Sequence, residues 1–227
     1  DSEKIRDCVK DPRSRDSGNT VLSKKFAGGN LNIVGSNSAS GLASRPIRIV
    51  LADEVDRYEQ SAGAEGDPIS LATKRTTTFW NKKIYMCSTP TIKGLSRIET
   101  AFEESDKRYY HVPCPECNES QVLKWKNVVW DEDKPETASY ACEHCGSVID
   151  ESKKQWMLKH GEWIASAPKS DTAGFHISEL YSVWSTWADM AKSFLEAKKN
   201  PEMLKTWINT ALGESWEEQG EAVEYET

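Results

Sequence analysis

The sequence feature that most constrains the fold is the stretch Ile47 to Asp56, which reads IRIVLADEVD. Four of its first five residues are apolar and mostly β-branched, as expected for a strand that is buried on both faces of a parallel sheet. Two carboxylates, Asp53 and Glu54, follow this strand directly. Because the ligand sites of open α/β sheets lie beyond the carboxyl ends of the strands, we expect both acids at a functional site.

An apolar strand that ends in Asp-Glu has the Walker B pattern of nucleotide hydrolases. In this pattern the Asp binds the Mg²⁺ ion on the nucleotide phosphates, and the Glu positions and activates the attacking water. The pattern is short, and a plain strand followed by an acidic loop explains it equally well. The rest of the chain has to decide between the two interpretations.

Further elements predicted around this strand fit part of an α/β ATPase core with a mainly parallel sheet. Short strands are predicted at 21–26 and 31–34, a helix at 69–79 and another strand at Lys83–Cys87. The last strand runs directly into Ser88-Thr89-Pro90, and we expect it beside the strand that ends at the acid pair. Hydroxyl groups at that place can contact a γ-phosphate or the attacking water, although a plain strand-ending turn explains the same three residues.

Charge is distributed unevenly along the chain. The formal net charge is −7, of which residues 201–227 carry −6 through seven Glu and one Lys. Residues 1–200 are therefore nearly neutral, which argues against a protein that coats nucleic acid through a broad basic face. A local basic channel is still compatible with this charge. No apolar run approaches the length of a membrane span, and the polar N-terminus has no segment like a secretory signal. The chain begins without Met, so we expect it to be a piece of something longer.

Four cysteines have the spacing of a metal site. They form two C-x-x-C pairs separated by 24 residues, Cys114 with Cys117 and Cys142 with Cys145. Each pair can direct two thiolates towards one point, and four thiolates complete a closed tetrahedral Zn²⁺ site. The sequence therefore predicts a zinc ribbon, in which a structural metal supplies folding free energy.

The same residues allow other interpretations of this region. A pair of disulfides is disfavoured, because the chain has no secretory signal and has two further cysteines, Cys8 and Cys87. His144 lies between two of the expected ligands and is interpreted as a bystander, since four thiolates already fill the site. Lys124 and Lys126 either meet DNA or form the solvated face of the ribbon.

Helix-capping signals mark the C-terminal part of the chain. Thr186 with Asp189 resembles the capping box of one helix, and Asn200-Pro201 supplies the cap and the first proline of the last helix. The tail from Gly213 onward is predicted to be a solvated acidic linker. The tryptophans in or beside these helices are predicted to be core residues: Trp184, Trp187, Trp207 and Trp216.

Several longer stretches resemble the lambda-type large terminase subunits of tailed bacteriophages. They run in the same order over nearly the whole chain: NIVGSNSASGLASRPIRIVLADEVDRY, MCSTPTIKGLSRIETAFEESD, CPEC, CEHCG, MLKHGEWIASAP, AGFHISELYS and WINTALGESWEE. Such subunits are similar to other packaging motors in having an N-terminal ATPase that drives DNA into a procapsid and a C-terminal nuclease that cuts the concatemer. The resemblance implies a P-loop NTPase fold of the ASCE, RecA-like type, here incomplete.

Carried over position by position, the resemblance makes Asp53 the Mg²⁺ ligand and Glu54 the catalytic carboxylate. It makes Ser88-Thr89-Pro90 the coupling motif, which links hydrolysis to movement on DNA. The motif G-x-x-x-x-G-K-[ST] is absent from the 227 residues, so we expect the phosphate-binding loop upstream of Asp1 and the nuclease carboxylates downstream of Thr227. By itself the chain is therefore expected to hydrolyse little or no ATP.

An arginine finger, which neutralises charge in the transition state, is also expected of such motors. The candidates are Arg13, Arg15 and Arg45, with Arg75 and Arg97 behind them. Taken singly, any one of these residues is more often a surface or structural arginine.

The resemblance implies a division of the chain into four parts. Residues 1–110 would be the later half of the ATPase core, with Walker B and the coupling motif. Residues 111–150 would be the zinc ribbon, and 151–212 a mixed α/β completion with C-terminal helices. Residues 213–227 would be an acidic linker towards a nuclease domain.

The resemblance also implies partners and a location. The expected partners are double-stranded phage DNA, the small terminase subunit and the portal of the procapsid, with the motor forming a homo-oligomeric ring. ATP and Mg²⁺ would be required besides Zn²⁺, no membrane would be involved, and the protein would act in the cytoplasm of a bacterial host, encoded by a phage or prophage.

Two alternatives of other classes stay open at this point. A DNA helicase also has an Asp-Glu strand end and a later motif with Ser and Thr, and ADEVD fits the pattern D-E-x-[DH] loosely. Against a helicase stands the lack of a second nucleotide-binding lobe after the ribbon. The non-enzymatic alternative is a zinc-ribbon interaction module on a degenerate ATPase scaffold.

Overall fold

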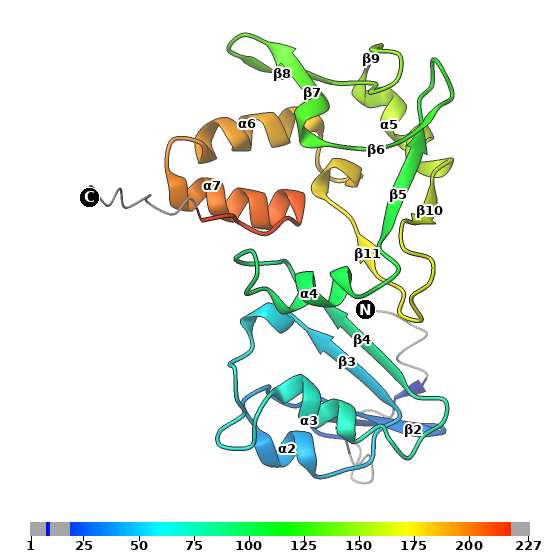
Figure 1. Ribbon diagram of the computed structural model, residues 1–227, viewed down its shortest axis with the longest axis vertical. Helices are drawn as coiled ribbons and strands as arrows, with labels where there is room; N and C mark the ends of the chain where they lie inside the picture. The colour runs from blue at the N-terminus through cyan, green and yellow to red at the C-terminus, as the bar shows by residue number, and fades with distance from the viewer. Residues whose placement is uncertain (1–7, 10–18, 219–227) are drawn as a thin grey trace, which may run out of the picture. The chain divides into compact units, whose positions relative to one another are not determined.

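The computed structural model describes residues 8–9 and 19–218, and the chain divides into two compact units. One unit contains the described residues up to Asp53 together with Arg57–Met86, and the other contains Glu54–Asp56 together with the residues from Cys87 onward. The chain thus first passes from one unit to the other between the two predicted functional acids. Both units combine helices with small sheets, so the fold is mixed α/β (Figure 1).

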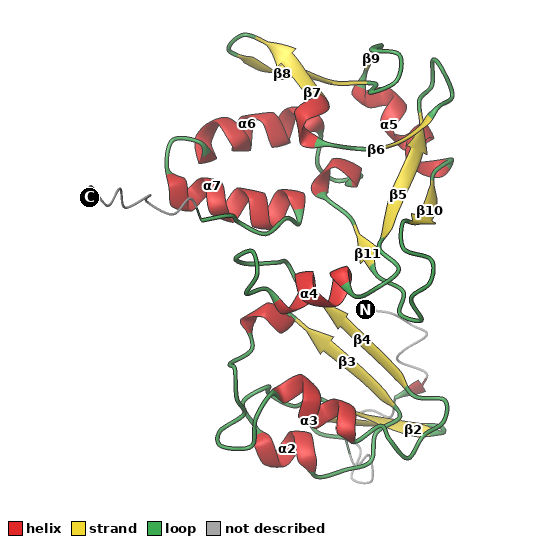
Figure 2. Ribbon diagram, viewed as in Figure 1, coloured by secondary structure: helices red, strands yellow, loops and turns green. Residues whose placement is uncertain are grey.

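The first unit contains a two-stranded sheet of β3 (Ile49–Asp53) and β4 (Lys83–Cys87). The two arrows run in the same direction in Figure 2, and the crossover between them contains α3 (Pro68–Lys74). This confirms the prediction that the strand before Ser88 lies beside the strand that ends at Asp53. The two strands therefore end at the same edge of this sheet.

Helix α3 is shorter than predicted. It begins at Asp67, whose side chain accepts a hydrogen bond from the Ser70 amide, and it has proline in its first turn. It ends at Lys74 rather than at residue 79, because a run of threonines follows. The hydroxyl groups of Thr76 and Thr77 donate to main-chain carbonyl groups three residues back, which competes with continuation of the helix.

Ahead of β3, β1 (Ser23–Phe26) and β2 (Gly29–Asn32) form an antiparallel hairpin that is a sheet of its own. The short helix α2 (Ala39–Ala43) then leads towards β3. Apart from the β3–β4 pair, the described strands pair mostly antiparallel, and the prediction of a mainly parallel ATPase sheet stays a prediction. Two closely spaced strands with Gly28 in the left-handed turn between them pair with each other locally.

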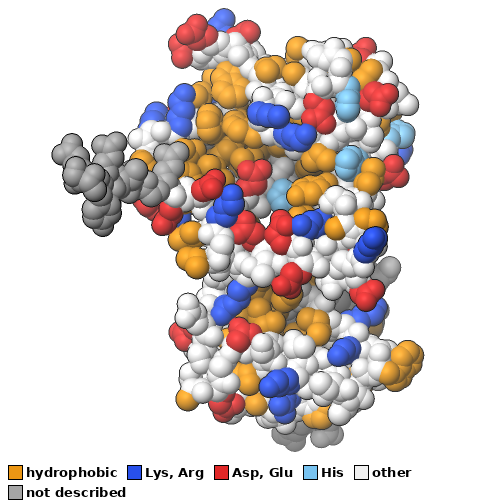
Figure 3. Space-filling model, viewed as in Figure 1, with side chains coloured by type: hydrophobic (Ala, Val, Ile, Leu, Met, Phe, Trp, Pro, Cys, Tyr) orange, Lys and Arg blue, Asp and Glu red, His pale blue; other side chains and the backbone are white. Residues whose placement is uncertain are grey.

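The prediction that β3 is buried on both faces is wrong for the described part of the chain. Ala52 is buried, but Leu51 is 68% exposed and Ile49 43% exposed, and Tyr85 of β4 is 58% exposed. The physical reason is that, among the residues that the structure describes, β3 and β4 form a sheet of two strands, and α3 packs near one part of it. Hydrophobic side chains accordingly reach the surface in this unit (Figure 3).

The second unit is organised around β5 (Arg108–Pro113). This strand pairs antiparallel with β10 (Glu162–Ala165) and β6 (Ser120–Val122), and parallel with β11 (Phe175–His176). A second antiparallel sheet has the order β7 (Val128–Asp131), β8 (Lys134–Ala141) and β9 (Val148–Ile149).

The side chain of Asp106, just ahead of β5, connects the first residue of β5 with the residue that precedes β11. Its carboxylate accepts hydrogen bonds from Nε of Arg108 at 2.8 Å and from the amide of Gly174 at 3.0 Å. The hydrogen bond from Arg108 is the main cause that lowers the pKa of Asp106 below its ordinary value of 3.8, with the Gly174 amide acting in the same direction and burial opposing them. The ion pair therefore favours the charged carboxylate at neutral pH.

Two helices of the second unit begin where the sequence predicts. Thr186 and Asp189 form a complete capping box, and Asn200 caps the last helix with Pro201 in its first turn. The helices are α4 (Arg97–Glu103), α5 (Lys154–Lys159), α6 (Trp187–Ala197), α7 (Pro201–Trp207) and the π-helix η5 (Ile208–Leu212). The described 3-10 turns are η1 (Val55–Arg57), η2 (Trp125–Asn127), η3 (Glu151–Lys153) and η4 (Glu179–Tyr181).

One hydrophobic core joins the cysteine-bearing sheets to the C-terminal helices. Tyr140 of β8 and Trp187 of α6 are both fully buried, and their ring centroids are 5.5 Å apart. Trp207 is buried as predicted, whereas Trp184 is 94% exposed and was wrongly placed in the core. Trp184 lies in the loop ahead of α6, where helical spacing does not determine which side chains face inward.

Candidate functional site

The acid pair lies where β3 ends, and its second residue has an unusual backbone conformation. Asp53 is the last residue of β3, and Glu54 has a φ of 56°, which is uncommon for a residue other than glycine. Both residues are exposed, whereas the next residue, Val55, is fully buried. Left-handed backbone of this kind costs free energy and is concentrated at functional sites, so it supports a role for this turn.

Asp56 organises the segments that follow the two strands. Its carboxylate accepts a hydrogen bond from the Thr91 hydroxyl at 3.0 Å and from the Ile98 amide at 2.8 Å. Its own amide donates to Oγ of Ser88 at 3.2 Å. Asp56 therefore connects the acid-bearing turn, the segment after β4 and the first turn of α4.

Sequence reasoning did not single out Asp56 as a functional residue. The available signal was the fourth position of the pattern D-E-x-[DH], which Asp56 fills and which was considered only as evidence for a helicase. A side chain at that position can contact the segment that follows the neighbouring strand.

The three residues of the predicted coupling motif differ in their surroundings. The Ser88 hydroxyl donates to the Thr89 carbonyl at 2.9 Å while it accepts from the Asp56 amide, and Pro90 is buried. The Thr89 side chain is half-buried, and its hydroxyl has no hydrogen bond with another described residue. Of the two hydroxyl groups, that of Thr89 is thus the one left for a ligand.

The predicted arginine-finger candidates are not brought together. Arg13 and Arg15 lie outside the described residues, and Arg45 contacts Oδ1 of Asn32 at 3.4 Å in the first unit. Arg75 donates to the carbonyl of Ala43 at 3.1 Å, which indicates a structural role. Arg97 donates to the carbonyl of Val55 at 3.2 Å, directly after the acid pair in the chain.

Cys114, Cys117, Cys142 and Cys145 converge as predicted. Their sulfur atoms all lie within 4.8 Å of one another, and the Cys114–Cys145 and Cys117–Cys142 distances are both 3.9 Å. Tetrahedral zinc with Zn–S bonds of about 2.3 Å requires about 3.8 Å between sulfur atoms, so the four thiols fit this metal. Contacts with the side chain and the backbone of Ser147 lower the pKa of Cys145 to about 6, whereas burial raises the pKa of Cys114. A bound metal would favour the thiolate of both cysteines.

The two cysteine pairs lie in matching turns. The Asn118 amide donates to the Cys114 carbonyl, and the Gly146 amide donates to the Cys142 carbonyl, at 2.9 and 3.0 Å. Asn118 and Gly146 have positive φ values of 63° and 72°. Each turn joins two antiparallel strands, β5 to β6 and β8 to β9, and such paired turns direct two thiols towards one point.

Gln121 connects the two turns and was not predicted. It is buried, its Nε2 lies 3.5 Å from Sγ of Cys142, and its Oε1 accepts from the Glu143 amide at 3.0 Å. A side chain that contacts both a ligand and the neighbouring backbone fixes the orientation of that ligand. A lone glutamine in a strand gives no sequence signal for such a role.

The flanking charged residues have structural contacts. His144 is outside the four-cysteine group, and its Nε2 lies 3.2 Å from the Ser120 carbonyl, as expected for a bystander. Nζ of Lys124 lies 2.7 Å from the carboxylate of Glu143. Because this ion pair occupies its charge, Lys124 is a poorer candidate for a DNA contact than its position suggested.

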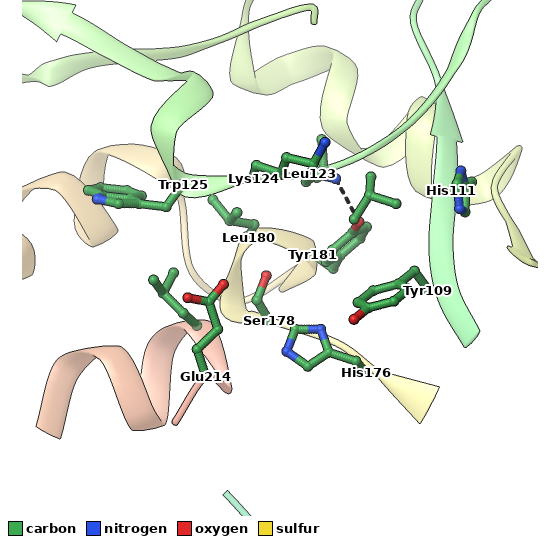
Figure 4. A pocket seen from close by; sticks show the side chains of 12 residues that line it. Tyr109, His111, Leu123, Lys124, Trp125, His176, Ser178, Leu180, Tyr181 and Glu214 are labelled. Atoms are coloured by element: carbon green, nitrogen blue, oxygen red, sulfur yellow. Dashed lines mark hydrogen bonds between the residues drawn. The ribbon is translucent and has the colours of Figure 1, made fainter. Parts of the chain in front are cut away.

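A separate cavity of about 480 Å³ lies within the second unit between β5, η4 and η5 (Figure 4). Tyr109, His176, Ser178 and Glu214 are among its polar lining residues. His176 has Nε2 at 3.1 Å from the Gly213 carbonyl and its ring 5.5 Å from that of Tyr109. The hydroxyl of Ser178 is buried and has no hydrogen-bond partner.

Two family models match the chain in sequence. Residues 1–163 match the model described as phage terminase large subunit gpA, ATPase domain. This chain belongs to that family of large terminase subunits. Residues 172–227 match the model described as terminase large subunit gpA, endonuclease domain.

Two curated large terminase subunits are similar over most of the chain. One, from Enterobacteria phage P21, is 35% identical over 236 aligned positions, which cover 92% of this chain and 36% of the relative. The other, from Escherichia phage lambda, is 30% identical over 225 positions, which cover 88% of this chain and 35% of the relative. The chain thus spans about a third of the length of each relative, and no solved structure matches it significantly.

Terminase membership decides between two of the interpretations left open by the sequence. The match over residues 1–163 favours a terminase ATPase over a helicase as the origin of the Asp-Glu strand end. The two models divide the chain between residues 163 and 172, inside the range 151–212 that we had treated as one part. Within the described part of the terminase chain, no helix is both long and apolar enough to cross a membrane.

Part of the predicted linker of this terminase chain is held in place. Trp216 forms a bridge with Ile92, and Nζ of Lys93 lies 3.2 Å from Glu217. The prediction of a solvated linker from Gly213 therefore needs correction up to residue 218, because main-chain hydrogen bonds order this segment. The acidic composition did not indicate these main-chain bonds.

Proposed function

We propose that this chain is part of an ATP-driven motor that packages phage DNA, and that it supplies the later part of the ATPase. The observation that carries the proposal is that β3 ends at Asp53, directly before Glu54, and that Ser88-Thr89-Pro90 directly follow its neighbour β4, in a chain that matches the terminase ATPase model. The longer protein to which we assign the chain is called the full-length parent below.

In this proposal Asp53 holds Mg²⁺ and Glu54 orients and activates the water that attacks the γ-phosphate. The donor set fits, because both carboxylates are exposed at the end of a strand and magnesium prefers oxygen ligands. Bound Mg²⁺ would neutralise charge that develops on the phosphates. The left-handed conformation of Glu54 turns the chain sharply after Asp53, and this supports separate roles for the two side chains.

Ser88, Thr89 and Pro90 couple hydrolysis to movement on DNA. Support comes from the hydrogen bond between the Asp56 amide and Oγ of Ser88, which connects the turn after Glu54 with the coupling motif. The free hydroxyl of Thr89 is the sensor that we assign to the γ-phosphate. We move Arg97 up beside Arg13, Arg15 and Arg45 among the finger candidates, because it contacts the backbone directly after the acid pair.

We place the phosphate-binding loop outside the 227 residues, since none of them form the motif G-x-x-x-x-G-K-[ST]. Without that loop the isolated chain would hold nucleotide poorly and hydrolyse little ATP. The remaining strands of a P-loop NTPase sheet would belong to the full-length parent as well.

We assign a structural Zn²⁺ ion to the four cysteines. Closed sites of four thiolates leave no position for substrate, so this metal would stabilise the ribbon rather than take part in hydrolysis. Because the ribbon shares its core with α6, the metal would also support the C-terminal helices.

The partners that we assign are double-stranded phage DNA, the small terminase subunit and the portal of the procapsid. They follow from the large terminase subunits that the chain resembles. We place the full-length parent, as a homo-oligomeric ring, in the cytoplasm of the bacterial host.

The proposal is tested by DNA packaging with the full-length parent. Purified parent, small subunit, procapsids and phage DNA are mixed with ATP and Mg²⁺, and the DNA protected from added nuclease is measured. Protection should require ATP and should be lost in Asp53→Asn, but not in the surface variant Glu65→Gln. Undiminished protection with Asp53→Asn would mean that the acid pair is not the ATPase site.

A further inference from the structure

The segment that follows the coupling motif is held from two sides in the second unit. On one side, the Thr91 hydroxyl donates to the carboxylate of Asp56. On the other side, the Thr91 carbonyl accepts from Nδ2 of Asn209 at 2.6 Å and from the Trp216 amide at 2.8 Å. Thr91 therefore connects the turn after the acid pair to residues near the end of the described chain.

Asn209 makes this connection through both hydrogens of its side-chain amide. Nδ2 donates to the carbonyl of Pro90 as well as to that of Thr91, and the side chain is only 6% exposed. Two consecutive carbonyl acceptors fix the orientation of the amide, since its oxygen cannot replace the nitrogen there. A displacement of the Pro90–Thr91 peptide would therefore break both hydrogen bonds together.

The position of Asn209 is not one that packing alone explains. Its Oδ1 is buried and has no hydrogen-bond partner, so the amide is poorly satisfied for a residue that only fills space. It lies in the π-helix Ile208–Leu212, a helix type that is rare and is often found at functional sites. These two features point to a role that depends on the contact with the coupling segment.

The parts joined by Asn209 match different family models. Pro90 and Thr91 lie in the ATPase match over residues 1–163, whereas Asn209 and Trp216 lie in the endonuclease match over residues 172–227. We propose that Asn209 is a positioning residue that relays the nucleotide state of the coupling segment to the endonuclease part, so that DNA cutting depends on ATP through this side chain. The inference rests on the proposed ATPase function and adds to it a regulatory link to cutting.

Substitutions at Asn209 can separate this relay from the fold. Asn209→Asp keeps the size of the side chain but presents only acceptor oxygens to the two carbonyl groups. The main-chain hydrogen bonds between Trp216 and the segment of Thr91 and Lys93 do not involve this side chain, so they remain available to hold the local fold. Thr210→Ala is the matched control, because Thr210 is exposed and its hydroxyl donates only to the Thr206 carbonyl within the helix.

The experiment uses the full-length parent and plasmid DNA with Mg²⁺, and measures ATP turnover and the rate of DNA cutting with and without ATP. The cutting ratio is the rate of DNA cutting with ATP divided by the rate without ATP. The full-length parent and Thr210→Ala should have the same cutting ratio. Asn209→Asp should keep ATP turnover within about twofold, but its cutting ratio should fall to about one. An Asn209→Asp protein that keeps the parent's ratio would overturn the relay.

The remaining outcomes are also decisive. If Asn209→Asp does not fold, Asn209→Ser, which removes the amide without adding charge, takes its place under the same criterion. If neither variant folds, Asn209 is needed for the fold and the relay is rejected. A parent that hydrolyses ATP but cuts DNA at the same rate without it contradicts only this inference, whereas a parent without ATP turnover contradicts the proposed function itself.

Discussion

The hydroxyl group of Thr91 donates a hydrogen bond of 3.0 Å to the carboxylate of Asp56. Asp56 lies two residues after Glu54, and Thr91 directly follows Ser88-Thr89-Pro90. The contact therefore joins the segments after the two strands of the β3–β4 pair. In a motor, such a contact would transmit a displacement of the turn after Glu54 to the segment after Ser88-Thr89-Pro90. Neither strand would have to move.

Removal of the Asp56 carboxylate should destabilise the second unit. Asp56→Ala leaves the Thr91 hydroxyl and the Ile98 amide without their acceptor, and each loss of this kind costs about 1–3 kcal/mol. We expect the free energy of unfolding, measured with denaturant, to fall by a comparable amount. Asp171→Ala, at an exposed carboxylate, should change it by less than about 0.5 kcal/mol. Equal effects of the two variants would show that the Asp56 contacts contribute little.

Loss of the Thr89 hydroxyl should uncouple the motor without weakening nucleotide binding. A group that only senses the γ-phosphate contributes little to affinity, whereas a group that carries transition-state charge costs several orders of magnitude when removed. In the full-length parent, Thr89→Ala should keep ATP affinity and most ATP turnover but should package almost no DNA. Thr77→Ala, an exposed threonine in the first unit, should package normally. A parallel loss of affinity, turnover and packaging in Thr89→Ala would instead assign the motif to binding or to the fold.

Much of the local structure follows directly from the sequence. The capping box at Thr186 and the Asn200-Pro201 pair locate two helix starts, because their hydrogen-bonding chemistry depends on few neighbouring residues. The convergence of the four cysteines is predictable for the same reason, since each pair and its turn lie within a short stretch. The β3–β4 pairing was predictable from two apolar strands with polar residues directly after them.

Contacts between distant segments could not be predicted in this way. Asn209 is 118 positions away from Thr91, and nothing in the local sequence of either residue indicates the other. The exposed face of β3 was missed because an apolar strand does not reveal how many neighbours its sheet has. The burial of Gln121 beside a cysteine sulfur likewise depends on two hairpins that meet only in the folded chain.

Zinc should be present at close to one ion per chain. The four sulfur atoms fit a tetrahedral site, so elemental analysis of reduced, dialysed protein should find zinc, and Cys142→Ser should lose most of it. Since the ribbon shares its core with α6, we expect this variant to melt at a lower temperature and its helical signal to fall. Cys8→Ser, outside the cluster, should retain the metal. Reduced protein that folds normally without any bound metal would contradict the assignment.

Stability should depend on pH through Asp106. Its pKa in the folded chain is lowered below the ordinary value of 3.8, mainly by the hydrogen bond from Arg108. The contribution of this group is therefore complete above the pKa of the unfolded chain and is lost as the pH falls through the lower, folded value. Asp106→Asn should have a lower free energy of unfolding than the unsubstituted chain at pH 7. This difference in free energy should shrink below about pH 4.

Denaturant unfolding of both proteins between pH 7 and pH 3 measures this difference. Asp171→Ala serves as a control for general effects of charge, because the Asp171 side chain is exposed. The free energies of unfolding of Asp106→Asn and the unsubstituted chain could instead differ by a constant amount over the whole pH range. That result would show that the contribution of Asp106 does not depend on its carboxylate charge.

The central claim is that Asp53 and Glu54 form the ATP hydrolysis site of a packaging motor. The most direct measurement is ATP turnover and ATP affinity of the full-length parent and of its Glu54→Gln variant, which keeps the size of the side chain but cannot accept the proton of the attacking water. General-base catalysis contributes typically 10²–10⁴-fold, so turnover should fall by about 100-fold or more while ATP affinity stays within about threefold. Turnover in folded Glu54→Gln that equals that of the parent would contradict the account.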